Sequence, residues 1–540
     1  MNDRCYVDAS AMIGRRGPKD QETRVETEAL LEEMEWCGIH GALVAHWTGK
    51  EYDPSYVNRK LLHELKKSPR LYGVWTVMPH HTGEMAPPAD VVKEMRDNGI
   101  HAAKMYPRTH HYFFSEDSCG ELLSTFEEEN ILLLLEGGAM YAPDIFDAAN
   151  QVLLTELDAV LTRHPRLHVL LQGSRWDATR YLHTLMSRHR HLSMEFSNHQ
   201  ANHALEVYSG WFGAERVVFG TGALDKSPGA AKAFVDYCTL PDEQKAMIAG
   251  KNLAGLLHLE QMPPPYRAST VRDPILRAAK AGQPLRDVLV IDAHAHIAHD
   301  GAQGTGFMHQ PFSDAASMVA RAKTMGMSAA CISAWIGVWS DYEEGNIIVY
   351  DAMRRFPRFY HGYATLQPQY VKDWKRELAK VHGRYRMGGI KPYYPRTGIP
   401  YNDKGWAPWF EYGNRHRCYV LIHPSDNFSA EMNDLIPRYP DLTFILAHSG
   451  GSFGTARAAI AIAKKFPNAV LEITLTSVTY RVIEFMVQHV GAGRVLFGTD
   501  QPMRDPIPQF GWMAYAHCTP AEKRKMFGEN MRAILRRVRW

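Results

Sequence analysis

The sequence predicts an α/β fold made of two tandem (β/α)8 TIM barrels joined by a short Pro-rich linker, and three observations support it. The 540-residue chain repeats itself with a period of about 280 residues. Short apolar runs alternate with amphipathic segments in the second copy. Each copy spans about 255 residues, which is the usual size of one such barrel.

The repeat is visible as matching motifs in the same order. Residues 8–12 (DASAM) correspond to residues 292–296 (DAHAH) at an offset of 284 residues. Residues 216–222 (RVVFGTG) correspond to residues 494–500 (RVLFGTD) at an offset of 278 residues. A drift of a few residues is what loop insertions and deletions cause, so the chain is predicted to be a duplication.

The boundaries of the two copies follow from the repeat. We expect a first barrel over residues 1–258, a linker over 259–284 and a second barrel over 285–540. The linker contains the segment Met-Pro-Pro-Pro-Tyr, and Pro-rich sequence forms semi-rigid spacers. A short helix is expected within the linker over residues 273–280.

Eight apolar runs in the second copy are candidate strands. Continuous apolar runs of this length are typical of parallel strands that are buried on both faces. A helical period between them, for example over residues 456–466, favours a closed barrel, with an open doubly wound sheet as the alternative. The GxGxxG pattern of nucleotide-binding sheets does not follow the first strand of either copy. The runs cover residues 288–293, 329–334, 360–366, 388–391, 418–422, 442–447, 469–474 and 494–499.

Composition excludes several classes of function. The chain is 45% hydrophobic and 22% charged, which is ordinary for a folded protein. Its formal net charge of +2 comes without a basic stripe, so we expect no nucleic-acid partner. Apolar runs are far shorter than the roughly 20 residues that cross a bilayer, so no membrane association is expected. Seven scattered cysteines and a start without a signal-peptide pattern predict a cytoplasmic location.

Histidines gather at the ends of the predicted strands. His294 and His296 end the first strand of the second copy, His423 follows the fifth, His448 the sixth and Asp500 the eighth. The carboxyl ends of parallel barrel strands meet at one face, where imidazole and carboxylate groups can bind a divalent metal. A single histidine after a strand is more often a loop or core residue. Together, the five residues predict one divalent metal ion, with zinc as the expected metal.

The motifs IDAHAH, LIHPSD, LAHSGG and LFGTD resemble the amidohydrolase superfamily, specifically its amidohydrolase-2 branch, which includes aminocarboxymuconate semialdehyde decarboxylase. The resemblance implies that His294, His296, His423 and Asp500 are metal ligands. It also implies that His448 handles protons, and that Asp500 shares in catalysis. Members of this branch often form dimers, so the two barrels are expected to form a pseudo-dimer within one chain, with a further homo-oligomer as an option.

The first copy has lost all five of these residues. This loss predicts a pseudo-catalytic first barrel, because Met and Gly side chains cannot hold zinc and Ser is a poor ligand. The alternative is a second site with different chemistry that uses Glu136 and Lys104. The replacements are Ser10, Met12, Glu136, Gln172 and Gly222.

Four further residues are candidate substrate contacts: Lys391, Trp335, Tyr393 and Arg396. Three of them have counterparts in the copy without ligands, which favours packing or contact with an anion over a second metal. The counterparts are Lys104, Trp47 and Tyr106. His382 and Arg504 are weaker candidates for an anion-binding rim, since an ordinary surface position is the simpler interpretation of each.

The predicted reaction is hydrolysis of an amide, ester or lactone in a small substrate that is carboxylated or cyclic. A divalent ion lowers the pKa of bound water toward about 7, and Asp500 would take the proton of the attacking water. His448 would hydrogen-bond the developing oxyanion or a substrate carboxylate. The alternative is decarboxylation of an aromatic or enoic carboxylic acid at the same metal, because a fold does not determine its reaction.

Overall fold

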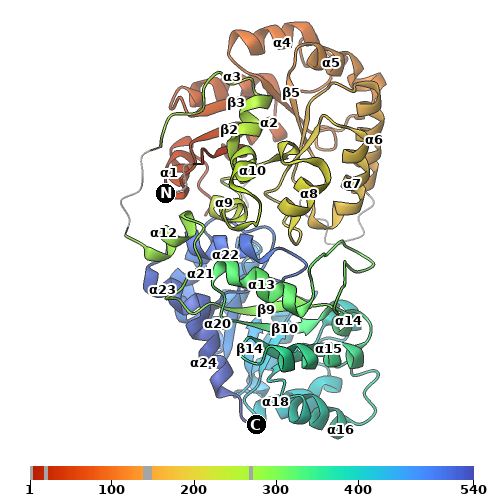
Figure 1. Ribbon diagram of the computed structural model, residues 1–540, viewed down its shortest axis with the longest axis vertical. Coiled ribbons are helices and arrows are strands. Elements are labelled where there is room, and N and C mark those ends of the chain that lie inside the picture. The colour runs from red at the N-terminus through yellow and green to blue at the C-terminus, as the bar shows by residue number, and fades with distance from the viewer. Residues whose placement is uncertain (1–3, 17–21, 138–148, 267–271) are drawn as a thin grey trace. The chain divides into compact units, whose positions relative to one another are not determined.

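The computed structural model describes residues 4–16, 22–137, 149–266 and 272–540, and the chain forms two compact units. Unit 1 comprises Met1–Arg272 with Gly306–His309, and unit 2 comprises Asp273–Thr305 with Gln310–Trp540. Within the described residues, each unit holds one sheet of eight parallel strands in sequence order, with helices outside it (Figure 1). The predicted pair of (β/α)8 barrels is therefore confirmed.

In unit 1 the eight strands are short, and parallel pairs join them from the first to the last. The backbone N–H of Ala9 donates to the carbonyl of Phe219 at 3.0 Å, which links the first strand to the residue just after the last. The strands are β1 (Val7–Ile13), β2 (Gly41–His46), β3 (Leu71–Thr76), β4 (Ala102–Met105), β5 (Leu132–Glu136), β6 (Val169–Gln172), β7 (Leu192–Glu195) and β8 (Val217–Val218).

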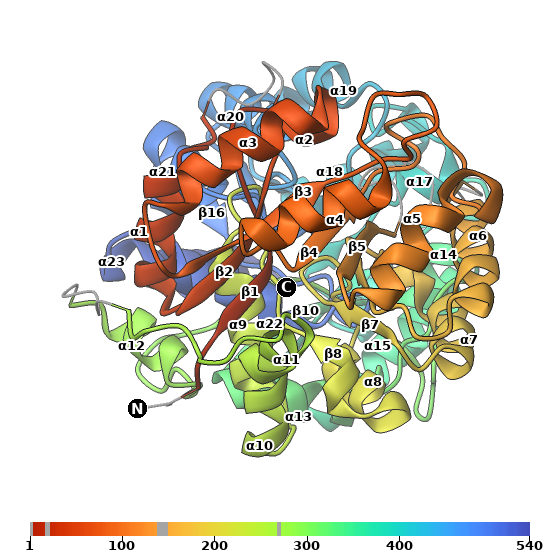
Figure 2. The same cartoon turned by 90° about the horizontal axis from the view of Figure 1, so that it is seen from above.

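The helices of unit 1 lie around its strands, as the view from above shows (Figure 2). They connect parallel strands, which require crossover segments. They are α1 (Thr27–Cys37), α2 (Thr48–Glu51), α3 (Pro54–Leu65), α4 (Pro88–Asp97), α5 (Glu116–Glu128), α6 (Ala149–Arg163), η1 (Trp176–Ala178), α7 (Thr179–Arg188), α8 (Ala204–Phe212), η2 (Ala214–Arg216), α9 (Pro228–Tyr237), α10 (Asp242–Ala246), η3 (Met247–Lys251) and α11 (Asn252–Leu256).

Unit 2 repeats this arrangement. The N–H of Ala293 donates to the carbonyl of Phe497 at 2.9 Å and joins its first strand to the residue just after its last. The strands are β9 (Ile291–Ile297), β10 (Ala329–Ala334), β11 (Tyr360–Ala364), β12 (Gly389–Ile390), β13 (Tyr419–Ile422), β14 (Thr443–Leu446), β15 (Ala469–Glu472) and β16 (Val495–Leu496).

The helices of unit 2 include a short one, α12, within the predicted linker, and α12 packs against α22 of the second barrel. The full set is α12 (Pro274–Lys280), α13 (Ala315–Met325), α14 (Trp335–Trp339), α15 (Tyr342–Arg355), α16 (Trp374–Leu378), η4 (Ala379–Arg384), α17 (Tyr394–Thr397), η5 (Lys404–Trp406), α18 (Ala407–Arg415), α19 (Phe428–Leu435), η6 (Ile436–Arg438), α20 (Phe453–Lys465), α21 (Val482–Val490), η7 (Ala492–Arg494), α22 (Pro506–Tyr515), α23 (Pro520–Arg524), η8 (Lys525–Glu529) and α24 (Asn530–Arg537).

Matching residues of the two copies make matching structural bonds. The carboxylate of Asp341 caps α15 by accepting from the N–H of Glu343, and Asp53 caps α3 through the N–H of Tyr56. Such caps satisfy backbone donors at a helix start. The N–H of Thr499 donates to Asp292 at 3.0 Å, as the corresponding pair Thr221 and Asp8 does at 2.9 Å. The matching aspartates therefore hold the scaffold together.

The predicted elements agree with the observed ones except at their ends. β10 has the predicted bounds, and α20 covers most of the predicted helix over 456–466. The first strand of unit 2 was predicted over 288–293, but β9 runs from Ile291 to Ile297 and carries both histidines within it. Among the described residues, we find no helix with the length and apolar character needed to span a membrane.

Candidate metal centre

The candidate ligands of unit 2 come from different strands and meet at one end of the barrel. His294 and His296 lie in β9, two residues apart, so their side chains leave the strand on the same side. Asp500 lies shortly after β16, and its backbone N–H donates to the carbonyl of His294 at 2.7 Å. This bond holds the segment after β16 against β9, so the carboxylate of Asp500 lies beside the two imidazoles.

Three donor atoms converge on one point. Oδ1 of Asp500 lies 3.2 Å from Nε2 of His296 and 3.6 Å from Nε2 of His294. All three side chains are buried, and their ligand atoms lie within 4.8 Å of one another. Ligands about 2.0–2.1 Å from a tetrahedral zinc ion are separated by roughly 3.3 Å, so these spacings fit a divalent metal.

Each of these imidazoles is oriented through its other ring nitrogen. Nδ1 of His294 lies 3.0 Å from Oε2 of Glu472, and Nδ1 of His296 lies 3.0 Å from Oγ of Ser333. Contacts of this kind set the orientation of metal-binding histidines and leave Nε2 available as the ligand atom. The support for a metal site is therefore present alongside the donors.

His423 and His448 form the next layer of the cluster. Nδ1 of His448 donates to the carbonyl of Thr474 at 2.7 Å, and Nδ1 of His423 donates to that of Pro424 at 3.0 Å. The His448 ring lies 5.0 Å from the His294 ring and 4.8 Å from the His423 ring. Among the described residues, His448 joins a second candidate group with His294 and Glu472, whereas His423 belongs to neither group.

The charges suit metal binding at neutral pH. Burial lowers the pKa of His294 well below its usual range and also lowers that of His296, so both rings are neutral and can act as ligands. Burial alone would raise the pKa of Asp500, but the guanidinium of Arg504, together with His296, holds it well below its usual range. The site thus combines neutral imidazoles with one ionised carboxylate.

Glu472, at the end of β15, is a positioning residue. It accepts from Nδ1 of His294, from the N–H of His448, and from both the N–H and the hydroxyl of Thr474. Burial raises the pKa of its carboxyl to about 8. Because its oxygens already have donors, Glu472 supports the ligand set in this structure.

Aromatic side chains border the candidate metal ligands. The ring of Trp335 stacks on His296 at a centroid distance of 4.0 Å and an angle of 17°. Tyr393 meets His423 edge-on at 5.2 Å. Nζ of Lys391 lies 3.2 Å from Nε2 of His294, whereas Arg396 lies over the ring of Trp339 at 3.9 Å. All four predicted substrate contacts are therefore near the site or on its aromatic border.

Two surface expectations were wrong. Arg504 is only 6% exposed, and it contacts the carboxylate of Asp500 and the hydroxyl of Thr476. His382 is buried, where Nδ1 donates to the carbonyl of Met387 and Nε2 accepts from Trp409. Nothing in the local sequence predicts the burial of Arg504, which stands four residues after Asp500.

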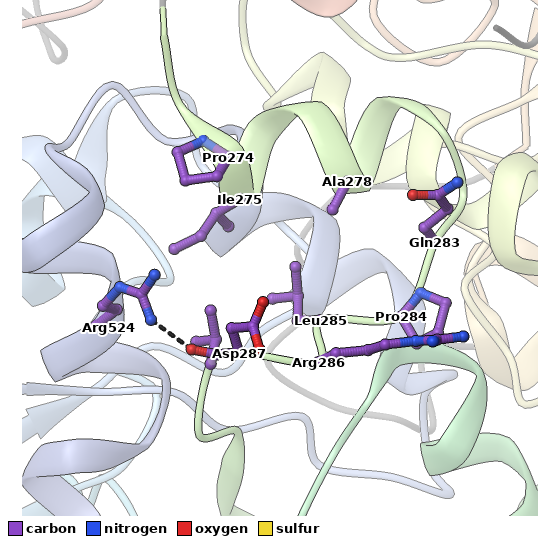
Figure 3. Close-up of a pocket in the computed structure, with 10 residues that line it drawn as sticks. Pro274, Ile275, Ala278, Gln283, Pro284, Leu285, Arg286, Asp287 and Arg524 are labelled. Atoms are coloured by element: carbon purple, nitrogen blue, oxygen red, sulfur yellow. Dashed lines mark hydrogen bonds between the residues drawn. The ribbon is translucent and has the colours of Figure 1, made fainter.

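Two cavities of unit 2 differ in their relation to the ligands. One of about 460 Å³ lies beside His448 and Ser449 and extends over residues 424–430. Another of about 490 Å³ lies between α12 and the segment before β9, where Arg524 bonds the carbonyl of Asp287 (Figure 3). The residues that line the second cavity precede β9 or lie near its start, at the amino end of the barrel. Of the two cavities, only the first lies at the end where the candidate ligands meet.

In unit 1, the positions that correspond to the ligands enclose a small cavity of about 50 Å³. Its lining contains lysines and carboxylates and, among the described residues, neither histidine nor cysteine. It consists of Ser10, Met12, Trp47, Lys104, Glu136, Gln172, Gly173, Glu195, Ser197, Gly222, Asp225 and Lys226.

Two solved structures illustrate what the chain resembles in three dimensions. The 5-carboxyvanillate decarboxylase of Sphingomonas paucimobilis is 16% identical with a TM-score of 0.38, over 46% of this chain and 99% of that one. A dihydroxybenzoic acid decarboxylase of Polaromonas with bound manganese is 16% identical with a TM-score of 0.38, over 46% and 97%. A search of curated proteins found no match.

A barrel with two histidines on its first strand and an aspartate after its last has the donor set that could hold a divalent metal ion. Residues 291–537, which make up most of the second barrel, match the sequence model of the amidohydrolase family. The family resemblance predicted from the motifs is confirmed.

Proposed function

We propose that the second barrel is a metal-dependent decarboxylase that acts on a planar aromatic or enoic carboxylic acid. The observation that carries this proposal is the buried contact between Arg504 and Asp500. A hydrolase would need Asp500 to take a proton from water, and a carboxylate whose pKa is held well below its usual range is a weak base. Decarboxylation requires no attacking water.

The side chains around the candidate ligands suit a flat, anionic substrate. Trp335, Trp339 and Tyr393 present aromatic surface beside the ligands, and aromatic rings pack well against planar groups. Lys391 is buried and lies next to His294, where its ammonium group can pair with a carboxylate. Substrate specificity would come from these side chains.

His294, His296 and Asp500 would hold the ion, with His423 as the further ligand that the family resemblance implies. A divalent ion bound there supplies a Lewis acid that polarises oxygens of the substrate. In the reaction the bond between the ring or enoic carbon and its carboxylate breaks, CO2 leaves, and a proton is added to the same carbon. We assign the transfer of that proton to His448, whose Nδ1 donates to the carbonyl of Thr474. Burial lowers its pKa to about 4, so the ring is neutral, and its Nε2 would first take a proton from water or from an acidic hydroxyl of the substrate and then pass it to the carbon.

The test compares the two reactions directly. The full chain, loaded with Mn²⁺ or Zn²⁺, is incubated in D₂O with hydroxylated benzoic acids and, separately, with lactones and amides. We expect CO2 release from a benzoic acid with one deuterium at the carbon that lost it, and His294→Ala should lack this activity. Hydrolysis of a lactone or amide without CO2 release from any acid would overturn the proposal in favour of a hydrolase.

A further inference from the structure

The cavity at the amino end of the second barrel is lined by residues that the candidate metal centre does not use. It has a volume of about 490 Å³ and lies between α12 and the segment that leads to β9 (Figure 3). Sites for small molecules usually have volumes of about 300–1,000 Å³. The size of the cavity therefore suits a small molecule.

Both walls of this cavity are held in place by bonds within unit 2. The carboxylate of Asp273 caps the start of α12 and lies 2.5 Å from the buried ammonium group of Lys523. On the other wall, the N–H of Leu285 donates at 3.0 Å to the carbonyl of Met325, the last residue of α13. A site whose walls are fixed before binding loses little conformational freedom when a ligand enters.

Part of the lining is apolar. Ile275 of α12 and Leu285 of the opposite wall are 1% and 4% exposed, and Pro284 and Val288 extend the same surface. Ala278 contributes only a methyl group, which leaves room between the walls (Figure 3). Such a surface favours a ligand with an apolar body, because contact removes both apolar surfaces from water.

Three charged side chains complete the lining: Arg524, Arg286 and Asp287. Among the described residues, these three side chains form no ion pair, and Arg524 donates only to the backbone carbonyl of Asp287. The neighbouring pair of Asp273 and Lys523 adds no net charge. Two guanidinium groups and one carboxylate therefore leave the cavity with an excess of one positive charge.

The two guanidinium groups differ in how firmly they are placed. Arg524 is half-buried and its bond to the carbonyl of Asp287 fixes it at one side of the cavity, whereas Arg286 is exposed and extends to the other side (Figure 3). A guanidinium group has five N–H donors, so Arg524 keeps donors for a second acceptor. Arg524 is therefore the better partner for an anionic group of a ligand.

The first barrel differs at the corresponding place. With the offset of 278 residues, the counterpart of Arg524 is Ala246. The arginine just before β1, Arg4, lies 2.9 Å from the carboxylate of Asp236 and 2.5 Å from that of Asp242. In the first copy the guanidinium group beside the start of the barrel thus has carboxylate partners within the barrel, and in the second copy Arg524 has a cavity beside it.

We propose that this cavity binds a small monocarboxylate with an apolar chain or ring, with the carboxylate at Arg524 and the apolar part against Ile275 and Leu285. The single negative charge of such a ligand matches the excess charge of the cavity, and its body matches the apolar wall. The site lies at the opposite end of the barrel from the candidate metal ligands, so it is independent of the reaction proposed above.

The test measures the binding of sodium octanoate to the full chain by calorimetry at constant ionic strength. Sodium acetate supplies the charge alone and octan-1-ol the apolar chain alone, and we expect both to bind more weakly than octanoate, which should saturate one site per chain. Arg524→Met should weaken octanoate binding about fivefold, as expected for a partly exposed ion pair. Asp287→Asn should strengthen it, because a carboxylate that repels the ligand is removed.

Three further variants locate the binding site. Ala278→Phe fills the cavity while keeping every charge, and it should abolish binding. Arg277→Met is the matched control, because Arg277 lies on α12 without lining the cavity, and it should bind octanoate like the unaltered chain. Lys391→Met, altered beside the candidate metal ligands, should do the same.

Three outcomes would overturn the proposal. The first is an absence of saturable octanoate binding. The second is unchanged binding by both Arg524→Met and Ala278→Phe, with thermal unfolding showing that both variants are folded. The third is a loss of binding in Lys391→Met alone, which would place the probe at the other end of the barrel.

Discussion

Nδ1 of His294 lies 3.0 Å from the carboxylate of Glu472, and this contact directs Nε2 of the same ring toward Asp500. Glu195 stands at the corresponding place in the first barrel. There it accepts only from Ser197, through the N–H at 2.6 Å and the hydroxyl at 3.0 Å, among the bonds found in the described residues. The glutamate thus anchors a loop in both barrels and orients the candidate ligand His294 in the second.

Glu472→Gln should weaken metal binding by about 10–100-fold, because an outer partner of a ligand is changed without loss of the ligand itself. Competition with a chromogenic chelator measures the affinity. Glu195→Gln is the matched control and should leave it unchanged. Equal losses in the two variants would mean that the glutamate acts through folding alone.

Each chain should bind about one divalent ion, and His294→Ala should remove it. The reason is that the converging donor set includes His294, whereas the lining of the first barrel's cavity offers no imidazole. Elemental analysis of both purified proteins gives the stoichiometry. A full equivalent of metal in His294→Ala would contradict the assignment of the ion to His294.

His448→Asn should keep nearly stoichiometric metal but lose most turnover. This follows from the assignment of His448 to proton handling, with Asp500, His294 and His296 as ligands. Metal content and CO2 release are measured on the same preparation. If the variant loses its metal as fully as His294→Ala does, His448 is a ligand and the assignment is wrong.

Arg504→Met should make metal retention more sensitive to acid. Arg504 helps hold the pKa of Asp500 well below its usual range, so its removal raises that pKa and lets protons compete for the carboxylate at higher pH. Metal content after dialysis at a series of pH values gives the midpoint of metal loss. That midpoint should move upward relative to the unaltered chain, and an unchanged midpoint would contradict the role given to Arg504.

The stability of the chain should fall as pH is lowered from about 6.5 toward 4. Burial lowers the pKa of His382 to about 4 in the folded state. As the pH falls, this histidine is therefore protonated in the unfolded state before it is protonated in the folded state, and the free energy of unfolding decreases across this window. One such histidine costs about 2 kcal/mol at pH 5 relative to pH 7.5. Urea denaturation at the two pH values tests this, and His382→Gln should show a smaller loss.

The duplicated fold could be predicted because strand patterns and repeats are local features of a sequence. The runs around 329–334 and 494–499 are apolar regardless of what surrounds them, and they became β10 and part of the segment leading to Asp500. The end of the first strand was harder to predict. β9 extends through His296 because residues 295 and 296 pair with Gln501 after the last strand, a contact that local sequence does not reveal.

The ligand candidates could be predicted from strand ends, but their supporting contacts could not. Ser333 and Thr474 orient the histidines across strands, and neither residue type signals this in a sequence. Arg504 looked like a surface residue because a lone arginine after a loop usually is one. Its burial depends on the position of Asp500, which only the assembled barrel determines.

The bonds between Asp8 and Thr221 and between Asp292 and Thr499 have one further consequence. The first barrel lacks the histidines of the second, so selection for barrel closure is sufficient to maintain the pair of Asp8 and Thr221 there. Substitutions such as Thr499→Val would therefore reduce the amount of folded protein in a cell before they changed the rate per molecule. A screen that scores growth alone would count these positions as catalytic. One that also measures protein abundance would separate the loss of folded protein from a loss of rate per molecule.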